Sequence, residues 1–375
     1  MHLSRSLLLM PVLSLSLAAT AQQKLPTLKD AYQKAFHVGV AINVAQITGK
    51  DAVGDALIEQ QFDSITPENV MKWEIIHPRP DAYNFDLADQ YVAFGVKNRM
   101  FIVGHNLCWH SQTPDWVFKD ASGKQISREA LLQRLHDHIF TVVGRYKGRI
   151  QSWDVVNEAL NEDGTLRNSR WLQIIGPEYI ARAYQWAHEA DPDAELNYND
   201  YNLENPAKRA GAIDLVKKLR NAGIPVAVIG DQAHVRVDWP SPDVEEQMIK
   251  DISAIGVKVA ITELDVDTLP AIDMTSADVA LHYESDPKLN PYPNGLPENM
   301  QKKLAAQYAS LFRVFLEYRN VMSRVTVWGL TDADSWRNDW PVRGRTDDCL
   351  LFDRKYTPKP AFAAVVAEAL KARLK

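Results

Sequence analysis

The feature that most constrains the fold is a regular alternation between short apolar runs and longer amphipathic segments. Runs typical of buried strands cover residues 37–42, 62–66, 100–105, 150–156, 194–198, 225–230, 257–262 and 325–330. Apolar residues at helical spacing fill the intervals, over residues 51–61, 87–97, 128–146, 178–190, 207–221, 242–255, 298–318 and 359–374, after a first helix-like run at 27–36. Strict alternation predicts a parallel sheet, and eight repeats predict an α/β protein that closes into a single (β/α)8 barrel, the TIM barrel.

The first 21 residues differ from the rest of the chain. Arg5 is the only formal charge before an apolar run over residues 7–19, which ends in Ala19-Thr20-Ala21. This pattern predicts a signal peptide at residues 1–21, and the run is shorter than the roughly 20 residues that cross a bilayer. No later run is long enough either. We therefore expect an exported protein, secreted or periplasmic and not embedded in a membrane, whose catalytic barrel occupies residues 22–375.

Charge and cysteine content narrow the choice of partners. The net charge of −6 and the isoelectric point near 5.9 offer no basic field for phosphate, which argues against nucleic acid as a main partner. Two cysteines, Cys108 and Cys349, are too few for a disulfide scaffold or a multi-cysteine zinc site. Export would permit a disulfide between them, but a large barrel does not depend on one. We expect two unpaired thiols, at least one of them buried.

Polar and aromatic residues cluster just after the predicted strands. In a (β/α)8 barrel these positions meet at the C-terminal rim of the strands, where the active site lies. The set combines carboxylates, amides and flat indole rings. Such a combination suits a carbohydrate, because sugar C–H faces stack on aromatic rings while the hydroxyls form hydrogen bonds. Its members are Glu68, Asn69, Lys72, Trp73, His105, Trp109, His110, Asn157, Glu158, Asn199, Asp200, Tyr201, Gln232, His234, Glu263, Asp265, Trp328, Trp336 and Trp340.

Two members of this set, Glu158 and Glu263, each follow an apolar strand, where an ionisable group is costly to bury without a function. They follow the fourth and the seventh strand, and barrel geometry leaves a gap of roughly 5 Å between carboxyl groups that reach inward from those strands. Such a gap suits a retaining glycosidase, in which one carboxyl is the nucleophile and the other the general acid and base. An inverting pair stays open on this geometry, as does a structural role in which arginines or backbone amides satisfy both carboxylates.

Seven ordered strings carry a family resemblance: TPENVMKW from Thr66, GHNLCWHSQTPDW from Gly104, SWDVVNEA from Ser152, NYNDYN from Asn197, GDQAH from Gly230, ITELD from Ile261 and WGLTDADSW from Trp328. In these strings the chain resembles the endo-β-1,4-xylanases of glycoside hydrolase family ten, over essentially all of residues 25–374. The resemblance implies hydrolysis of β-1,4-xylosidic bonds within xylan and xylo-oligosaccharides by a retaining double displacement. We expect no cofactor, no catalytic metal, and a monomer.

The resemblance also implies individual roles. Glu158 would be the general acid and base, Glu263 the nucleophile, and Asn157 the donor to the sugar 2-hydroxyl. His234 and Asp265 would orient and tune Glu263, with Gln232 nearby. The implied glycone-side contacts are Glu68, Asn69, Lys72, His105, Trp109, Trp328 and Trp336, with Trp73 counted among the substrate contacts and Tyr201 on the leaving-group side.

The sequence departs from the family pattern in two places. Asp231 precedes Gln232 where a small or apolar residue is more usual, and we expect no change in the chemistry from it. Residues 268–297 are rich in Pro, Asp and Asn and predict an extended loop on the active rim. Because rim loops carry binding contacts, we expect this loop to affect the leaving-group subsites.

Several histidines and tryptophans have simpler interpretations. His136 and His138 lie two apart on a predicted helix and point to different sides, which favours a solvated helix face over a metal site. His105, His110 and His234 lie on the rim, but no His-x-His motif follows the first strand to complete a metal site. Residues expected to pack in the core, because they lie within strands or helices, are Trp153, Trp171 and Trp186.

Two other functions are compatible with parts of the pattern. A cellulase or mixed-linkage glucanase barrel would share the Asn157-Glu158 pair but should lack the TPENVMKW string of the second strand. A carbohydrate-binding protein built on an inactive barrel would be expected to have lost one glutamate, whereas Glu158 and Glu263 are both present.

Overall fold

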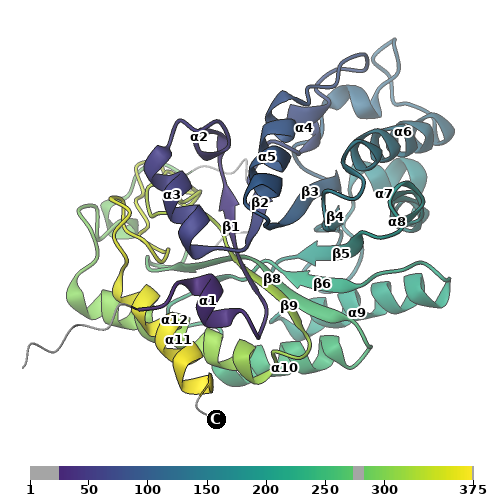
Figure 1. The fold of residues 1–375 in the computed structure, drawn as a ribbon. Helices are drawn as coiled ribbons and strands as arrows, with labels where there is room; N and C mark the ends of the chain where they lie inside the picture. The colour runs from purple at the N-terminus through teal and green to yellow at the C-terminus, as the bar shows by residue number, and fades with distance from the viewer. Residues whose placement is uncertain (1–24, 273–282, 374–375) are drawn as a thin grey trace, which may run out of the picture.

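The computed structural model describes residues 25–272 and 283–373 (Figure 1). The predicted signal peptide at residues 1–21 lies outside the described residues, as do residues 273–282 of the predicted rim loop. Among the described residues, no helix combines the length and the apolar character that a membrane span requires.

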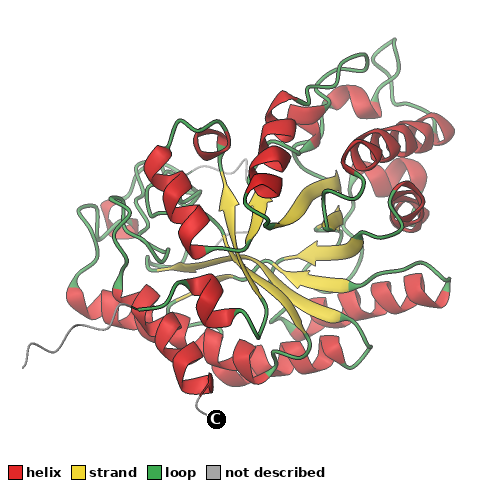
Figure 2. Ribbon diagram, in the orientation of Figure 1, coloured by secondary structure: helices red, strands yellow, loops and turns green. Residues whose placement is uncertain are grey.

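Eight parallel strands form a closed barrel, which confirms the fold predicted from the alternation (Figures 1 and 2). In order around the barrel they are β1 (His37–Ile42), β2 (Ser64–Pro67), β3 (Phe101–Trp109), β4 (Ser152–Asn157), β5 (Glu195–Asp200), β6 (Val228–Asp231), β8 (Lys258–Asp267) and β9 (Met322–Val327). Strand β9 returns to β1 in parallel, with Val325 beside Val38, and so closes the ring. A short strand that the sequence did not predict, β7 (His234–Arg236), pairs in parallel with the end of β8.

Helices surround the strands, as Figure 2 shows. The helices between and after the barrel strands are α3 (Ala52–Gln61), α5 (Asp86–Lys97), α6 (Arg128–Tyr146), α8 (Glu178–Ala190), α9 (Pro206–Asn221), α10 (Pro242–Ser253), α11 (Glu298–Glu317) and α12 (Pro360–Arg373). The leading helix α1 (Leu28–Tyr32) packs on α12, where the Tyr32 hydroxyl donates to the Val365 carbonyl over 2.8 Å. Short additional helices are α2 (Val44–Ile47), α4 (Trp73–Ile76), α7 (Arg170–Ile175) and the 3-10 helices η1 (Asp115–Phe118) and η2 (Pro287–Leu289).

Polar caps explain where two of the long helices begin. The Ser127 side chain accepts the Ala130 N–H at the start of α6, and the Asn205 side chain accepts the Ala207 N–H at the start of α9. Each cap satisfies one of the N–H groups that have no partner within the first turn of a helix. The predicted start of α6 is therefore confirmed, and that of α9 agrees to within one residue.

The barrel interior combines tight apolar packing with a buried polar layer below the rim. A Cβ atom at Gly104 would lie 2.2 Å from the ring of Trp153, so only glycine at this position leaves room for the indole. Next to them, Asp154 pairs with His105 over 3.0 Å and with the fully buried Arg324 over 3.4 Å. Because every charge in this layer has a partner, it supports the site above it without an unpaired buried ion.

Two strands differ from their predicted bounds. Strand β6 begins at Val228, three residues after the predicted start at Pro225. Strand β8 continues past the predicted end at residue 262 to Asp267, because β7 pairs with its last three residues, Asp265–Asp267. Both Glu263 and Asp265 therefore lie within a paired strand, which restricts their backbone. The thiols of Cys108 and Cys349 are free and buried, as expected.

The prediction of a solvated helix face is wrong for His138. This residue is fully buried on α6, where its ring stacks on Trp73 with centroids 3.6 Å apart. The short helix α4, which the sequence did not predict, brings Trp73 against that face of α6. His136 keeps about a third of its side chain exposed (36%). The expected core tryptophans are confirmed, since Trp153 and Trp171 are buried and Trp186 packs on the core while partly exposed.

Candidate active site

A cavity of about 670 Å³ opens at the C-terminal ends of the strands. Its wall includes residues from the ends of β2 to β6 and of β7 to β9, so the rim residues of the sequence meet in one place. Thirteen of the fifteen predicted site residues line it: Glu68, Asn69, Lys72, His105, Trp109, Asn157, Glu158, Tyr201, Gln232, His234, Glu263, Trp328 and Trp336. The two others, Trp73 and Asp265, do not line it.

Glu158 lies directly after β4 and receives hydrogen bonds on both carboxylate oxygens. Trp109 Nε1 donates to Oε2 over 2.8 Å, while Gln232 Nε2 and Asn157 Nδ2 donate to Oε1 over 2.9 and 3.2 Å. His110 Nδ1 lies 3.8 Å from Oε2. Burial alone would raise the pKa of Glu158, but His110 and the hydrogen bonds from Gln232 and Trp109 outweigh burial and lower it. The site without substrate therefore favours the ionised carboxylate.

The backbone of Glu158 adopts a left-handed conformation, with φ of 56°. This region is uncommon for a residue with a side chain, and such strain persists only where the surroundings impose it. Here the Glu158 N–H donates to the Asn199 carbonyl over 2.8 Å, and Arg167 Nε donates to the Glu158 carbonyl over 3.0 Å. Both backbone groups of Glu158 are thus held, which turns its carboxylate toward the cavity.

Glu263 lies in β8 across the cavity mouth from Glu158. Its Oε1 accepts a hydrogen bond from Asn199 Nδ2 over 2.9 Å, and the same Nδ2 donates to Asn157 Oδ1 over 2.8 Å. Thr262 Oγ1 donates to Asn199 Oδ1 over 2.6 Å and so fixes the orientation of that amide. Because Asn157 in turn contacts Glu158, amide groups connect the two carboxylates.

His234 connects Glu263 to a buried ionic group. Its Nε2 lies 3.4 Å from Glu263 Oε2, and its Nδ1 lies 2.9 Å from Asp265 Oδ2. Burial alone would lower the pKa of His234, but Asp265 and Glu263 outweigh burial and raise it to about 9. The imidazole is therefore protonated at neutral pH, and both ring nitrogens donate.

Asp265 is fully buried behind the cavity wall. Besides His234 it accepts from Trp336 Nε1 and from Arg337 Nε, both over 2.7 Å. Burial opposes its ionisation, but Arg337 and His234 outweigh burial and lower the pKa of Asp265 to about 2. This carboxylate therefore acts on the site through the two rings that it holds, His234 and Trp336.

The β2 side of the cavity presents a buried cation. Lys72 Nζ donates to Asn69 Oδ1 over 2.9 Å and to Gln112 Oε1 over 2.8 Å, and it lies 5.1 Å from the ring centre of Trp109. Burial lowers the pKa of Lys72, although Glu263, Glu68 and Glu158 oppose this change. Burial likewise raises the pKa of Glu68, against the effect of Lys72. Carboxylate, amide and ammonium groups in this wall can bind sugar hydroxyls as acceptors and donors.

The β5 side presents Tyr201 against two cations. Arg167 Nη2 donates to the Tyr201 hydroxyl over 2.7 Å, and Lys208 Nζ lies 3.3 Å from the ring centre. Lys208 also pairs with the fully buried Asp200 over 3.0 Å. The Tyr201 ring is therefore held in place beside the backbone of Glu158, which Arg167 also contacts.

Trp73 does not contact the cavity, contrary to the expectation that it binds substrate. It is buried at the start of α4 between His138 and Trp171, with ring centroids 3.6 and 5.5 Å from its own. The reason is local, because Lys72 is the N-cap residue of α4 and points to the cavity, while the next residue begins the helix and faces the core. Trp73 therefore supports the wall that carries Lys72.

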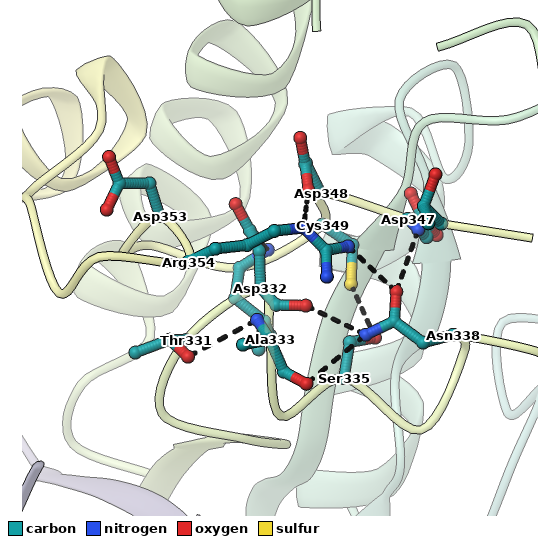
Figure 3. Close-up of polar contacts among 12 residues, drawn as sticks. Thr331, Asp332, Ala333, Ser335, Asn338, Asp347, Asp348, Cys349, Asp353 and Arg354 are labelled. Carbon is teal, nitrogen blue, oxygen red and sulfur yellow. Dashed lines mark hydrogen bonds and ion pairs between the residues drawn. The ribbon is translucent and has the colours of Figure 1, made fainter. Parts of the chain in front are cut away.

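The loop after β9, which carries Trp336, is held by side-chain hydrogen bonds centred on Asn338 (Figure 3). Asn338 Nδ2 donates to the Asp332 carbonyl over 2.9 Å, and Asn338 Oδ1 accepts from the Asp347 N–H over 3.1 Å and from Arg354 Nη2 over 2.9 Å. Figure 3 also shows Ser335 Oγ in contact with Cys349 Sγ, 3.2 Å apart. These contacts join the two ends of the loop and hold Trp336 over the cavity.

The sequence had assigned no role to several residues of this site. Asn199 and Gln112 both lie inside matching strings, NYNDYN and GHNLCWHSQTPDW, so a signal for them was present. Arg167 and Arg337 lie outside strands and helices, and neither belongs to a matching string. Of the predicted rim loop, Ala271 and Ile272 line the cavity, so its first part, residues 268–272, lies on the rim, whereas no residue of 283–297 is among those that line it. Its effect on the leaving-group subsites stays a prediction.

Nearly the whole chain matches one family of known proteins, both in sequence and in structure. The model of Glycosyl hydrolase family 10 matches residues 27–368. A protein named endo-1,4-beta-xylanase A, from Xylanibacter ruminicola, is 45% identical over 353 residues, which cover 94% of this chain and 95% of that one. The structure of a GH10 endoxylanase from a sugarcane soil metagenome has a TM-score of 0.88 at 45% identity, covering 91% of this chain and 99% of that one. An intracellular xylanase of Thermoanaerobacterium saccharolyticum, solved as a mutant with xylotriose, has a TM-score of 0.79 at 36% identity, covering 92% and 99%.

Proposed function

The chain belongs to glycosyl hydrolase family 10, and from this premise we propose that it hydrolyses internal β-1,4-xylosidic bonds in xylan and xylo-oligosaccharides with retention of configuration. The observation that carries the proposal is the pair of buried glutamates, Glu158 and Glu263, which face one cavity and are connected through the amides of Asn157 and Asn199. The relatives named as xylanases support xylan as the substrate.

In the first step, an oxygen of Glu263 attacks the anomeric carbon of the sugar at the bond to be cleaved. The bond from that carbon to the leaving oxygen breaks, and Glu158, which carries a proton in the productive substrate complex, transfers it to the leaving oxygen. The products are a glycosyl ester on Glu263 and a free sugar chain. The contacts of Asn199 and His234 with the Glu263 carboxylate support this role, because they fix the orientation of the attacking carboxylate.

In the second step, Glu158 acts as a base. It takes a proton from water, the water oxygen attacks the anomeric carbon, and the bond to Glu263 breaks. The three hydrogen bonds that Glu158 accepts in the free site suit this step, because they stabilise the ionised form that a base requires. Asn157 would donate to the sugar 2-hydroxyl, whose hydrogen bond strengthens in the transition state.

Two variants separate the roles of the glutamates, because protonation of the leaving oxygen matters only when that oxygen is strongly basic. Glu158→Ala should lose roughly 10²- to 10⁴-fold on xylan, the usual contribution of general acid–base catalysis. On a nitrophenyl xylobioside its first step should stay nearly normal, with a burst of phenol followed by slow turnover, since water then lacks its base.

Glu263→Ala should lose activity on both substrates without a burst, because no leaving-group acidity replaces a missing nucleophile. The measurement is stopped-flow release of nitrophenol alongside reducing-sugar release from xylan. Equal losses by the two variants on the activated and the natural substrate would mean that the roles, or the covalent mechanism, are wrong.

The comparison of xylan with carboxymethylcellulose tests the substrate. Xylose lacks the hydroxymethyl group of glucose, and we propose that Trp336 closes the space that this group would occupy. A higher rate on carboxymethylcellulose than on xylan would favour the cellulase alternative. No hydrolysis of either polymer would favour an inactive, carbohydrate-binding barrel.

We also propose that the protein is exported after removal of residues 1–21, which leaves residues 22–375 as one catalytic domain. The apolar run before Ala19-Thr20-Ala21 supports this, although one relative is described as intracellular. Mass spectrometry of the protein recovered outside the cytoplasm should give an N-terminus at Gln22. Recovery of the full chain in the cytoplasm would contradict export.

A further inference from the structure

Arg167 contacts two residues of the cavity wall from a position behind that wall. Its Nε donates to the Glu158 carbonyl over 3.0 Å, and its Nη2 donates to the Tyr201 hydroxyl over 2.7 Å. Glu158 and Tyr201 line the cavity, whereas Arg167 is not among the described residues that do. Any effect of Arg167 on a bound substrate therefore passes through one of these two residues.

A hairpin that follows β4 returns the chain to Glu158. Leu160 and Leu166 pair across it as an antiparallel bridge, and the Arg167 N–H donates to the Ala159 carbonyl over 2.7 Å. Opposite residues of an antiparallel pair lie close together, so the residue that ends the hairpin lies beside the residue at which it begins. The pairing of the hairpin therefore places the Arg167 side chain next to the Glu158 backbone.

The tip of the hairpin is fixed on α9. Gly164 has φ of 80°, and a Cβ atom at this position would lie 2.5 Å from the Ala207 carbonyl oxygen, so only glycine allows this close approach. Next to it, Glu162 pairs with the fully buried Lys208 over 3.1 Å. Because the hairpin is held both at its tip and along its length, Arg167 has a fixed place before any ligand binds.

The backbone of Glu158 depends on such support. Its φ of 56° lies in the left-handed region, which persists for a residue with a side chain only where the surroundings impose it. The guanidinium holds the Glu158 carbonyl through Nε and the Leu160 carbonyl, 3.3 Å away, through Nη2. Its planar set of donors fits two carbonyls at once, whereas an ammonium group is a single point charge. Without the guanidinium the backbone of Glu158 can relax toward an ordinary conformation, which moves the carboxylate.

Arg167 also contributes charge to the surroundings of Glu158. Burial raises the pKa of Glu158, and the groups that outweigh burial and lower this pKa are, largest first, His110, the hydrogen bonds from Gln232 and Trp109, and Arg167. The other titratable groups that interact with Glu158 come from the β2 and β5 sides and are Lys72, Asp200 and Tyr201. Because a guanidinium stays protonated in proteins, Arg167 lowers the pKa of Glu158 at every working pH.

We propose that Arg167 is a positioning residue for general acid–base catalysis, which fixes the Glu158 backbone and so holds the Glu158 carboxylate in the orientation that proton transfer requires. The inference rests on the proposed xylanase function and adds to it a residue that touches neither the sugar nor the reacting atoms. Glu158 alone exchanges the proton with the leaving oxygen and with water. The contact with the Tyr201 hydroxyl keeps the guanidinium in place on its other side.

Arg167→Met tests this role, because it keeps the apolar stem and removes both the donors and the charge. On xylohexaose, kcat should fall roughly 10- to 100-fold with KM changed by less than about threefold, because a small misplacement of a catalytic group is felt mainly in the transition state. On nitrophenyl xylobioside, the first-turnover rate of nitrophenol release should stay within about twofold, since this leaving group needs no proton. The alkaline limb of kcat on xylohexaose should move to higher pH, because the pKa of Glu158 rises when the positive charge is lost.

Two further variants separate charge from geometry. Arg167→Lys keeps the charge but not the planar set of donors, so its alkaline limb should lie close to that of the unaltered enzyme while its kcat stays reduced. If circular dichroism shows that Arg167→Met does not fold, Arg167→Lys decides, since an undiminished kcat in that variant would overturn the inference. The control is Arg170→Met, which removes an arginine of α7 whose Nη1 donates to the exposed Asp115 over 2.7 Å and which does not line the cavity. It should change neither kcat nor the alkaline limb.

The outcomes separate this inference from the proposed function. An unchanged kcat and alkaline limb in Arg167→Met, in an enzyme that cleaves xylohexaose, would overturn the inference alone. A rise in KM with kcat unchanged would also overturn it, because Arg167 would then act through Tyr201 on substrate binding. So would an equal loss in the first turnover of nitrophenyl xylobioside, because the effect would then extend to the attack by Glu263. Failure of the unaltered protein to cleave xylohexaose or xylan would overturn the proposed function itself.

Discussion

The indole nitrogen of Trp336 donates a hydrogen bond to Asp265 over 2.7 Å. The ring that we propose to select xylose is therefore held by the same carboxylate that pairs with His234 and, through it, with Glu263. One buried carboxylate, that of Asp265, therefore holds both the proposed selective ring and the histidine that contacts Glu263. A change at Trp336 should consequently affect both, and two substitutions can separate the effects.

Trp336→Ala should open the space for a hydroxymethyl group and raise the ratio of activity on an aryl cellobioside to activity on an aryl xylobioside by roughly tenfold, the usual worth of one small group in a pocket. Turnover of xylan should fall. Trp336→Phe keeps most of the bulk but not the N–H, so it should lower both activities and leave their ratio nearly unchanged. A ratio that stays constant or falls in Trp336→Ala would contradict the proposed role.

The alkaline limit of activity should respond to Trp109. In the substrate complex the reaction requires Glu263 ionised and Glu158 protonated, so the pH profile of kcat should be bell-shaped, and its alkaline limb should report chiefly Glu158. The hydrogen bond from Trp109 Nε1 is one of the contacts that lower the pKa of Glu158. Trp109→Phe removes that donor, raises the pKa of Glu158, and should move the alkaline limb of kcat to higher pH.

The control for this shift is Trp116→Phe, because Trp116 lies in η1 and does not line the cavity. Its alkaline limb should match that of the unaltered enzyme. If Trp109→Phe also leaves the limb in place, a group other than Glu158 sets it, and His234 would be the next candidate because its pKa is raised to about 9.

Protonated His234 should stabilise the fold in a pH-dependent way. Its pKa rises from 6.5 to about 9 on folding, so the contribution is complete below pH 6.5 and is lost as the pH rises through about 9. The difference between these pKa values corresponds to about 3 kcal/mol. Urea denaturation of the unaltered protein and of His234→Gln should show a stability difference that is larger at pH 6 than at pH 10. A difference independent of pH would contradict the ionic role of His234.

The three buried carboxyl groups of Asp231, Glu204 and Glu245 should also make stability fall as the pH rises, but from a lower pH. Burial, followed by mutual repulsion, raises the pKa of Asp231 and of Glu245 well above the usual range, while Lys208 and Arg209 oppose these rises. Both carboxylate oxygens of Glu245 lack hydrogen-bond partners among the described residues. Because the unfolded chain ionises near pH 4 while the folded chain keeps these protons, they reduce stability as the pH rises above about 4.

Glu245→Gln should therefore raise the melting temperature at neutral pH by roughly 2–4 °C, with a smaller gain near pH 4. Scanning calorimetry at both pH values gives the measurement. Glu246→Gln provides a contrast on the same helix, because hydrogen bonds from Lys250 and Tyr318 lower the pKa of Glu246, and its loss should not stabilise the protein. A loss of stability in Glu245→Gln at neutral pH would show that the carboxylate is ionised and paired.

Several parts of this protein follow from local sequence. The alternation of apolar runs with amphipathic segments predicted the barrel, and the bounds of β1, α6 and α8 agree with the prediction. Periodicity succeeds here because each strand and helix must bury its apolar residues at its own spacing. The barrel then places every strand end at one rim, so the positions of Glu158 and Glu263 in the sequence were enough to place both at the cavity.

Other features depend on residues far apart in the chain. Strand β7 forms only because the end of β8 offers it a parallel partner, and that pairing brings His234 next to Asp265. His138 is buried because α4 packs on α6, an orientation that periodicity within α6 alone does not specify. For the same reason, Lys72 reaches the cavity while its neighbour Trp73 faces the core.

The sequence by itself determined the fold class, the rim and the presence of Glu158 and Glu263 on it, since these depend on the spacing of apolar residues and on the order of the strands. Only the tertiary structure decided the electrostatic state of each group. In the free site the carboxylates of Glu158 and Asp265 are ionised, and His234 is protonated, because of partners on β3, β7, β8 and the segments that follow β6 and β9. A pKa depends on burial and on charges within a few ångströms, and no pattern along the chain reports which residues meet at that distance.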